Sequence, residues 1–316
     1  MTKSSVPIVC IGGAVVDRNL TCTHGFELGV SNPVTSTTSF GGVARNVAES
    51  LGRLGANVRL VSAVGKDAAG AALLAHIKTA GVDTSLAVVR DDLPTAEYIA
   101  AMSDGEMRVA FADMAIFDQL TPDRVKPALA GLPSLSMVFA DCNLPTETLA
   151  MLLEGSSRRL YFLAFDGVSP AKCERLPKRL DALAILFTNS AQLSSMTRLS
   201  KVENAVERMA KRGCATIVAT LGDEGLLLAD EDRRALYSAP QVPIVSVAGA
   251  GDAIAAGTLF AISQTNELPS AVTCGIALAS LALQTVHAVP QHLSLDVLKA
   301  VLAAPAPTRK GPKRVH

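Results

Sequence analysis

The most informative segment of the sequence is Val247-Ala248-Gly249-Ala250-Gly251-Asp252-Ala253-Ile254-Ala255-Ala256-Gly257. Two glycines flank an alanine just before the acid, and an apolar helical run follows. Glycines allow backbone N–H groups to turn toward a ligand, and a helix N-terminus adds positive potential. The stretch therefore predicts a helix whose first turn forms a nest for an anion. Asp252 could accept a proton from an attacking hydroxyl beside that anion, or it could simply cap the helix. The motif alone favours neither role.

Short apolar runs alternate with helical patterns on both sides of this stretch. The sequence predicts strands at 8–11, 58–64, 137–140, 160–165, 184–187 and 216–219, and helices at 43–54, 68–80, 145–153, 202–211, 252–262 and 269–283. Such alternation is typical of an α/β fold, in which helices cover both faces of a parallel sheet.

Two regions break the alternation. Residues 95–101 and 107–111 flank Asp104-Gly105, a strong signal for a hairpin turn, and residues 20–39 have no helical period. We expect the segments from about 18–39 and 95–112 to form a small β-sheet beside the α/β body. The basic, Pro-rich tail at 304–316 is expected to be disordered, and a nucleic-acid-binding arm is a less favoured alternative.

Composition excludes several classes of protein. The chain has 316 residues, 49% hydrophobic and 18% charged, so it can bury a large core and is not a disordered chain. Lys+Arg and Asp+Glu are both 29, and there is no Trp, which argues against a partner that is a nucleic-acid polymer. The six cysteines form no CxxC pair, so we expect reduced thiols in a cytoplasmic protein.

Two apolar segments could be mistaken for a signal peptide or a membrane-spanning helix. Residues 6–16 contain Pro7 and Gly12-Gly13, which favours a buried strand and turn over a signal peptide. Residues 271–286 are interrupted by polar side chains and are shorter than the ~20 residues that span a bilayer. We expect a buried helix there and no membrane partner.

Three further glycine motifs follow predicted strands or open a predicted helix. Each one alone also fits close packing or an ordinary surface turn. They are Gly12-Gly13 with Asp17, Gly41-Gly42 with Asn46, and Thr220-Leu221-Gly222-Asp223-Glu224-Gly225. Asp17 could accept two adjacent sugar hydroxyls, and Asn46 could bond another hydroxyl.

Together, in this order and with Asn189, these motifs resemble the ribokinase-like (PfkB) carbohydrate and nucleoside kinases over residues 6–303. The resemblance implies a three-layer α/β/α domain with a mostly parallel central sheet and a β-sheet lid. It also implies transfer of the ATP γ-phosphate to a hydroxyl. Asp252 would be the catalytic base, and the amides of Gly249, Ala250 and Gly251 would form the anion hole. The implied acceptor-binding residues are Asp17, Gly41, Gly42 and Asn46, and the implied ATP-binding residues are Asn189, Thr220, Gly222 and Gly225.

Local patterns resemble the pseudouridine kinases within this family. They include the run 36–49, Thr95-Ala96-x-Tyr98, Asp141-x-Asn143 and Asp166-x-Val168-Ser169-x-x-Lys172. This similarity implies phosphorylation of the 5′-hydroxyl of pseudouridine, and it adds Thr95, Tyr98 and Asn143 on the acceptor side and Lys172 as a phosphate contact. A kinase of the family acting on ribose, another nucleoside or a ketose is one alternative. A non-catalytic binding protein on the same fold is the other.

Three positions depart from the family pattern. Gln192 stands where the family usually has a Glu that orients water around Mg²⁺, so we expect only an indirect and weakened contact with the metal. Ser246 and Ala248 replace the usual Asp or Asn and Thr, which puts activation by a monovalent cation such as K⁺ in doubt. Relatives often pair through their lids, so the resemblance also implies a homodimer.

Overall fold

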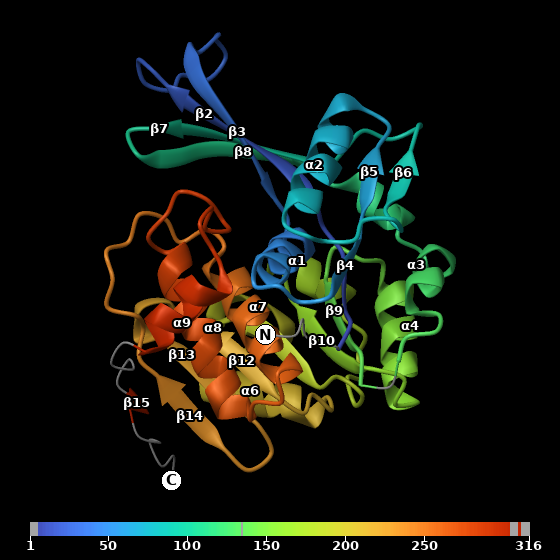
Figure 1. Ribbon diagram of the computed structural model, residues 1–316. Coiled ribbons are helices and arrows are strands. Elements are labelled where there is room, and N and C mark those ends of the chain that lie inside the picture. Colours follow the sequence, from blue (N-terminus) through green and yellow to red (C-terminus); the bar gives the residue numbers. More distant parts are fainter. Residues whose placement is uncertain (1–5, 134, 304–308, 311–316) are drawn as a thin grey trace.

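The computed structural model describes residues 6–133, 135–303 and 309–310. The main sheet contains six parallel strands: β1 (Ile8–Ile11), β4 (Val58–Val61), β9 (Met137–Asp141), β10 (Phe162–Asp166), β11 (Ile185–Asn189) and β12 (Ile217–Thr220). Three antiparallel strands extend it: β13 (Leu226–Ala229), β14 (Arg234–Tyr237) and β15 (Arg309–Lys310). The order across the sheet is β15-β14-β13-β12-β11-β10-β9-β1-β4 (Figure 1). The predicted mostly parallel central sheet is confirmed.

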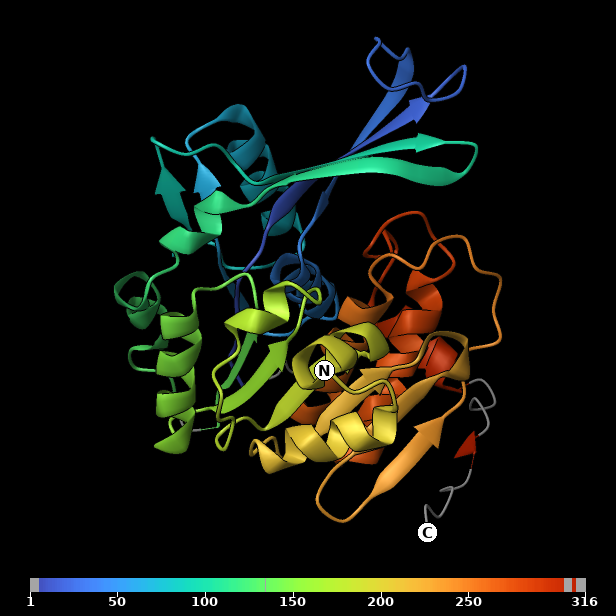
Figure 2. The same ribbon diagram turned by 180° about the vertical axis from the view of Figure 1, so that it is seen from behind.

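Helices cover both faces of this sheet. One face carries α1 (Val43–Arg53), α7 (Ala250–Ser263), α8 (Leu268–Ala282) and α9 (Leu295–Ala303), which lie in front in Figure 1. The other carries α3 (Pro122–Leu129), α4 (Thr146–Ser157), α5 (Ser190–Thr197) and α6 (Val202–Lys211), of which α4 and α6 lie in front in Figure 2. Because the sheet separates two buried apolar clusters, the fold has the three layers that the resemblance implied.

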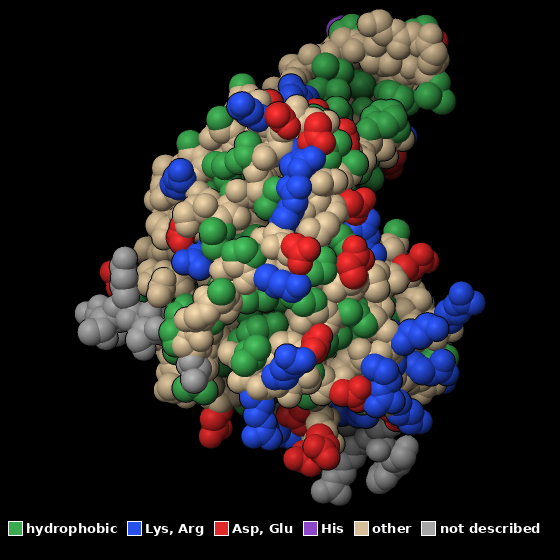
Figure 3. Space-filling model, turned by 90° about the vertical axis from the view of Figure 1, so that its right-hand side faces the viewer, with side chains coloured by type: hydrophobic (Ala, Val, Ile, Leu, Met, Phe, Trp, Pro, Cys, Tyr) green, Lys and Arg blue, Asp and Glu red, His purple; other side chains and the backbone are tan. Residues whose placement is uncertain are grey.

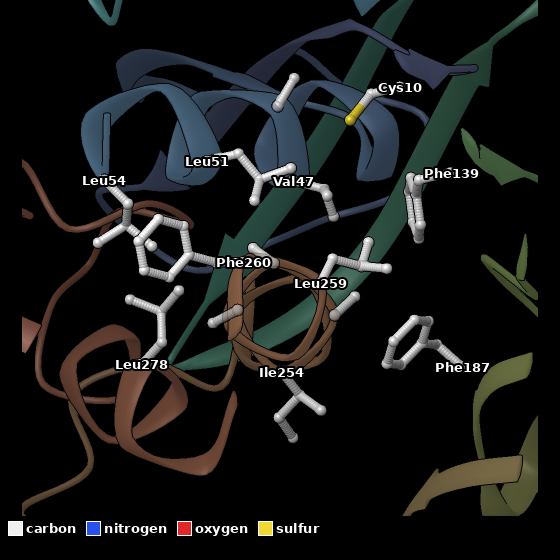
Figure 4. Packing of buried hydrophobic residues seen from close by; sticks show 14 of the residues in the cluster. Cys10, Val47, Leu51, Leu54, Phe139, Phe187, Ile254, Leu259, Phe260 and Leu278 are labelled. Carbon is white, nitrogen blue, oxygen red and sulfur yellow. The ribbon is translucent and has the colours of Figure 1, made fainter. Parts of the chain in front are cut away.

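Helix α7 lies at the centre of the front layer. Figure 4 shows Leu259 turned toward Phe139 of the sheet, and Phe260 lying between Leu54 and Leu278. These side chains are 8% exposed or less. Burial of one such side chain stabilises a fold by roughly 1.5–3 kcal/mol, so this packing fixes the helix on α1, α8 and the sheet. The start of α7 is thereby held at the carboxyl edge of the parallel strands.

The predicted accessory sheet is present as a lid. It is formed by β2 (Val15–Cys22), β3 (Val34–Gly41), β7 (Glu97–Ser103) and β8 (Glu106–Asp113), in the order β3-β2-β7-β8. The predicted hairpin turn is confirmed, because Asp104 and Gly105 both have positive φ, at 56° and 79°. The lid projects from the body and carries hydrophobic side chains at its surface (Figure 3).

Several elements differ from those expected. The strand predicted at 58–64 is divided: β4 pairs with β1, whereas β5 (Ala63–Gly65) pairs with β6 (Val88–Arg90) beside α2 (Ala68–Thr79). Helices α3, α5 and α9 and strands β13 and β14 were not expected from the sequence. In the tail, Arg309–Lys310 pairs with β14, and the remaining residues of 304–316 lie outside the described part.

The two apolar segments and the six cysteines all lie in the described part of the chain. The segment 6–16 contains β1 and the start of β2, and most of 271–286 lies in α8. No helix among the described residues is long and apolar enough to cross a bilayer. All six cysteines are free, and five of them are buried.

A buried carboxylate joins the segments that surround the carboxyl edge of the sheet. Asp141, at the end of β9, accepts hydrogen bonds from the backbone N–H groups of Gly13 and Ala44 on Oδ2 and of Asn143 on Oδ1, each at 2.9 Å. Gly13 belongs to the turn between β1 and β2, and Ala44 to the first turn of α1. One side chain therefore sets the start of the lid and the start of α1 against β9.

We predict that Asp141→Asn lowers the free energy of unfolding by about 2 kcal/mol, because an amide retains one acceptor oxygen and turns its NH₂ group toward a backbone donor. Urea denaturation measures the change, and the exposed Asp91→Asn serves as the matched control. Equal stability of the two variants would contradict the cross-link.

Candidate active site

The site lies where the carboxyl ends of the parallel strands meet the first turns of α1 and α7. The starts of α1 and α7 lie below the lid sheet (Figure 1). Side chains from β2, β9 and α1 interact there with Asp252 of α7. In open α/β sheets this edge is the usual place for ligands.

Asp252 is the third residue of α7, and it is not the N-cap of that helix. Gly249 occupies the cap position, and the Asp252 carboxylate accepts a hydrogen bond of 2.6 Å from Nδ2 of Asn46. Burial raises the pKa of Asp252 to about 6; Asn46 and the nearby Arg45 cation lower it, and the Asp141 charge raises it. A carboxyl with a pKa near neutrality suits a group that accepts a proton at physiological pH.

The glycines before Asp252 create open space at the start of the helix. Gly249 has φ of 78°, and a Cβ there would lie 2.2 Å from the carbonyl oxygen of Ala288, so only glycine fits. A Cβ on Gly251 would meet no atom within 4 Å. Amide groups of a first helical turn have no intrahelical partners, so they face this space. The N–H of Ala250 makes only a long contact, 3.4 Å, with the carbonyl of Val247.

Asp17 and the glycine pair 41–42 lie on the acceptor side. A Cβ on Gly41 would lie 2.0 Å from Oδ2 of Asp17, so this glycine admits the carboxylate. Gly42 caps α1 with φ of 95°. Burial raises the pKa of Asp17 to about 6, and the Arg45 cation lowers it.

Three lid-side and strand-end residues are placed differently from one another. Tyr98 pairs in register with Asp17, so both side chains share one face of the lid, and the Tyr98 hydroxyl contacts Sδ of Met107 at 3.5 Å. The Asn143 side chain is buried against Gly13. Thr95 is buried and its hydroxyl donates to Asp67 and accepts from the N–H of Gly65, so its hydroxyl anchors the lid strand to α2.

A cavity of about 890 Å³ opens beside the start of α7. Ala250 and Gly251 form one side of it, and Ile244 and Val247 add an apolar wall. Its lining includes four of the five residues expected on the ATP side, with Lys172 the exception; the four are Asn189, Thr220, Gly222 and Gly225. The structure thus gathers these residues around one space that reaches the first turn of α7.

Gln192 is not placed as a metal contact would be. Lys172 is not placed as a contact to a phosphate in the cavity would be. Gln192 and Asn189 form a capping box on α5: Oε1 of Gln192 accepts from the Asn189 N–H and from the Thr188 hydroxyl. Lys172 lies in the 3-10 turn Lys172–Arg175, outside the cavity lining, with Arg175 and Asp118 as its main charged neighbours. Burial lowers the pKa of Lys172, and Arg175 lowers it further.

Ser246 and Ala248 belong to the turn that leads into α7. The Ser246 hydroxyl accepts a hydrogen bond of 3.1 Å from the N–H of Ala248. The hydroxyl therefore stabilises the turn.

Three charged residues received no role from the sequence, although all three stand in the quoted patterns. They are Arg45, Asp141 and Asp166. All three are buried, and the Asp252 and Asp141 charges add to burial in raising the pKa of Asp166. The available signal in the sequence was a charged residue inside a mainly apolar or glycine-rich run. Charged residues are rarely buried without a partner, so such a position indicates a specific interaction.

Comparison with known proteins agrees with this geometry. The model of the pfkB family carbohydrate kinases matches residues 7–292, so the chain belongs to that family. It is a sugar or nucleoside kinase, a phosphotransferase with an alcohol group as acceptor. The pseudouridine kinase of Escherichia coli (strain K12) is 30% identical over 257 residues, which are 79% of this chain and 82% of that protein.

Solved structures share the fold. A carbohydrate kinase from Agrobacterium tumefaciens has a TM-score of 0.83 and 30% identity, covering 96% of this chain and 99% of its own. The ribokinase of Arabidopsis thaliana, solved with ribose and ATP, has a TM-score of 0.80 and 18% identity, covering 95% and 99%. The ribokinase-like fold expected from the sequence is confirmed.

Proposed function

We propose that this kinase transfers the γ-phosphate of ATP to the 5′-hydroxyl of pseudouridine. One observation carries the proposal. The Asp252 carboxylate is hydrogen-bonded to Asn46 on the acceptor side, and it lies next to Ala250 and Gly251, which line the cavity. Similarity to a pseudouridine kinase and the shared local patterns support the choice of acceptor.

In this proposal each group of residues has one role. Asp17 and Asn46 hold the ribose hydroxyls, and Asn189, Thr220, Gly222 and Gly225 surround ATP. As the 5′-oxygen attacks the γ-phosphorus, its proton passes to Asp252, the new O–P bond forms and the bond to the departing ADP oxygen breaks. The amides at the start of α7 stabilise the charge on the transferring group, and the lid excludes water.

Mg²⁺ enters the proposal as the ion that accompanies ATP, held by its phosphates and by water. Gln192 does not fit the role of orienting that water as placed, since its amide oxygen already accepts two hydrogen bonds. The departures at Ser246 and Ala248 lead us to propose a kinase without a strict need for K⁺.

We predict that Asp252→Asn lowers kcat by roughly 10²–10⁴-fold and leaves ATP binding nearly unchanged, because the amide cannot take the proton. In the wild type, kcat/KM is expected to fall as the pH drops below about 6, since the base must be ionised. Coupled ADP release measures the first effect and its pH profile the second. Near-normal turnover of the variant would refute the role of Asp252.

Acceptor preference tests the substrate. We predict that pseudouridine exceeds uridine in kcat/KM by about tenfold or more and that both exceed ribose. Pseudouridine carries an additional ring N–H, and a polar group built to bond it is left unpaired by uridine. The same assay over nucleosides, ribose and ketoses supplies the values. A higher kcat/KM for another sugar would assign the chain to a different branch of the family, and no turnover with any acceptor would favour a non-catalytic binding protein.

The lid also supports a homodimer. By strand register, Val34 and Phe111 lie on the face opposite Asp17, and they are 39% and 64% exposed. A second lid that covers this apolar face would remove it from water.

We predict a solution mass of about twice 32.8 kDa, and a monomer for Phe111→Asp. Light scattering after gel filtration gives both masses. Val89→Asp is the matched control, because Val89 is 53% exposed on β6, outside the lid. A monomeric wild type would contradict the dimer.

A further inference from the structure

Arg45 is a buried cation in the first turn of α1, next to Asn46 in the chain. Only 3% of it is exposed. Its Nη1 donates to Oδ1 of Asn46 at 2.6 Å and to the carbonyl of Phe40 at 2.5 Å, and its Nη2 forms an ion pair with Glu49. A fully buried guanidinium is rare without such partners.

We propose that Arg45 is a positioning residue that orients the Asn46 amide and keeps Asp252 ready to accept a proton. The inference rests on the proposed function in assigning the proton to Asp252. It goes beyond that function in assigning a role to Arg45.

The direction of the hydrogen bonds fixes the orientation of the Asn46 amide. A guanidinium has only donors, so the atom of Asn46 that faces Arg45 must be Oδ1. The NH₂ group of Asn46 is thereby turned to Asp252, to which Nδ2 donates at 2.6 Å. An amide that donates to a carboxylate favours its ionised form, which is the form of a general base.

The charges near Asp252 also point to Arg45. Asp252 interacts electrostatically with the acids Asp17 on β2, Asp141 on β9 and Asp166 on β10, and Arg45 on α1 is the cation that acts on it. Burial lowers the pKa of Arg45 to about 10, and the charges of Asp17 and Asp252 oppose that fall. The guanidinium therefore stays ionised at neutral pH and offsets part of the repulsion among the acids.

Arg45 is itself held in place by partners on two elements. Glu49, which is 2% exposed, pairs with Arg45, with Arg53 at 2.7 Å and with His76 at 3.4 Å. The Phe40 carbonyl that Arg45 binds lies in β3, one residue before the end of that lid strand. Arg45 thus joins the end of a lid strand, the Asn46 amide and the Glu49 carboxylate at one point.

The test measures Asp252 directly, without turnover. Carboxyl ¹³C NMR of protein labelled at aspartate follows each titration, and Asp252→Asn assigns the resonance. We expect Arg45→Met to raise the pKa of Asp252 by about one unit, since an opposite charge a few ångströms away shifts a carboxyl by that order. Arg45→Lys retains the charge and is expected to recover part of the shift.

Two variants separate positioning from general packing. Arg53→Met removes a cation that binds the same Glu49 carboxylate but not Asn46, so the pKa of Asp252 is expected to stay within a few tenths of a unit. Arg45→Met combined with Glu49→Gln avoids an unpaired buried carboxylate, and it gives the measurement if the single variant fails to fold.

Turnover gives a second readout. We expect Arg45→Met to lower kcat roughly 10- to 100-fold with a smaller change in the acceptor KM, and to move the acid limb of kcat/KM to higher pH. An unchanged pKa of Asp252 in folded Arg45 variants, or an equal shift in Arg53→Met, would overturn the inference. An inactive wild type would refute the proposed function instead, and the NMR titration would still decide the role of Arg45.

Discussion

The carboxylate of Asp141 is the constraint on which the site depends. Its three hydrogen bonds to backbone N–H groups join β9, the turn after β1 and the first turn of α1. Asp17 follows that turn by four residues, and Asn46 lies two residues into the helix from Ala44. The acceptor-side groups are therefore placed by one buried acid. Burial raises the pKa of Asp141, and the hydrogen bonds from the backbone offset part of that rise.

The second constraint is the meeting of two helix starts. The first turns of α1 and α7 approach closely enough for Asn46 to bond Asp252 across 206 residues of sequence. Apolar packing of α7 against α1 and the sheet holds this approach. Positive potential from two helix ends thus adds up where the transferred phosphate is placed in our proposal.

Much of this could be predicted from the sequence because it rests on local signals. The buried strand at 8–11 and the helix at 202–211 have the expected bounds, since apolar runs and helical periodicity are read from neighbouring residues. The antiparallel strands β13 and β14 were missed, because four-residue strands beside polar turns carry little period.

The site residues, too, differ in how well the sequence predicted their surroundings. The resemblance to the family implied that Asn189 and Gly225 lie on the ATP side, and both line the cavity. Thr95 and Gln192 have the right residue types, yet Asp67 and the start of α5 already engage their polar atoms. The partner of Thr95 lies 28 residues away in sequence, so the spacing around Thr95 does not reveal it. The capping box of Gln192 is local, because Asn189 stands three residues before it, so that contact could have been read from the sequence.

The two halves of the site come from separate halves of the chain. Every group assigned to the acceptor precedes residue 144, whereas the groups that line the cavity begin at Asn189. The lid excursions start and end within that first part, at Val15–Gly41 and Glu97–Asp113. With the residue roles that we propose, changes in this part would diversify the accepted alcohol while the phosphoryl-donor half stays constant. A chimera that joins two relatives within 144–188 would therefore exchange acceptor choice as a single module.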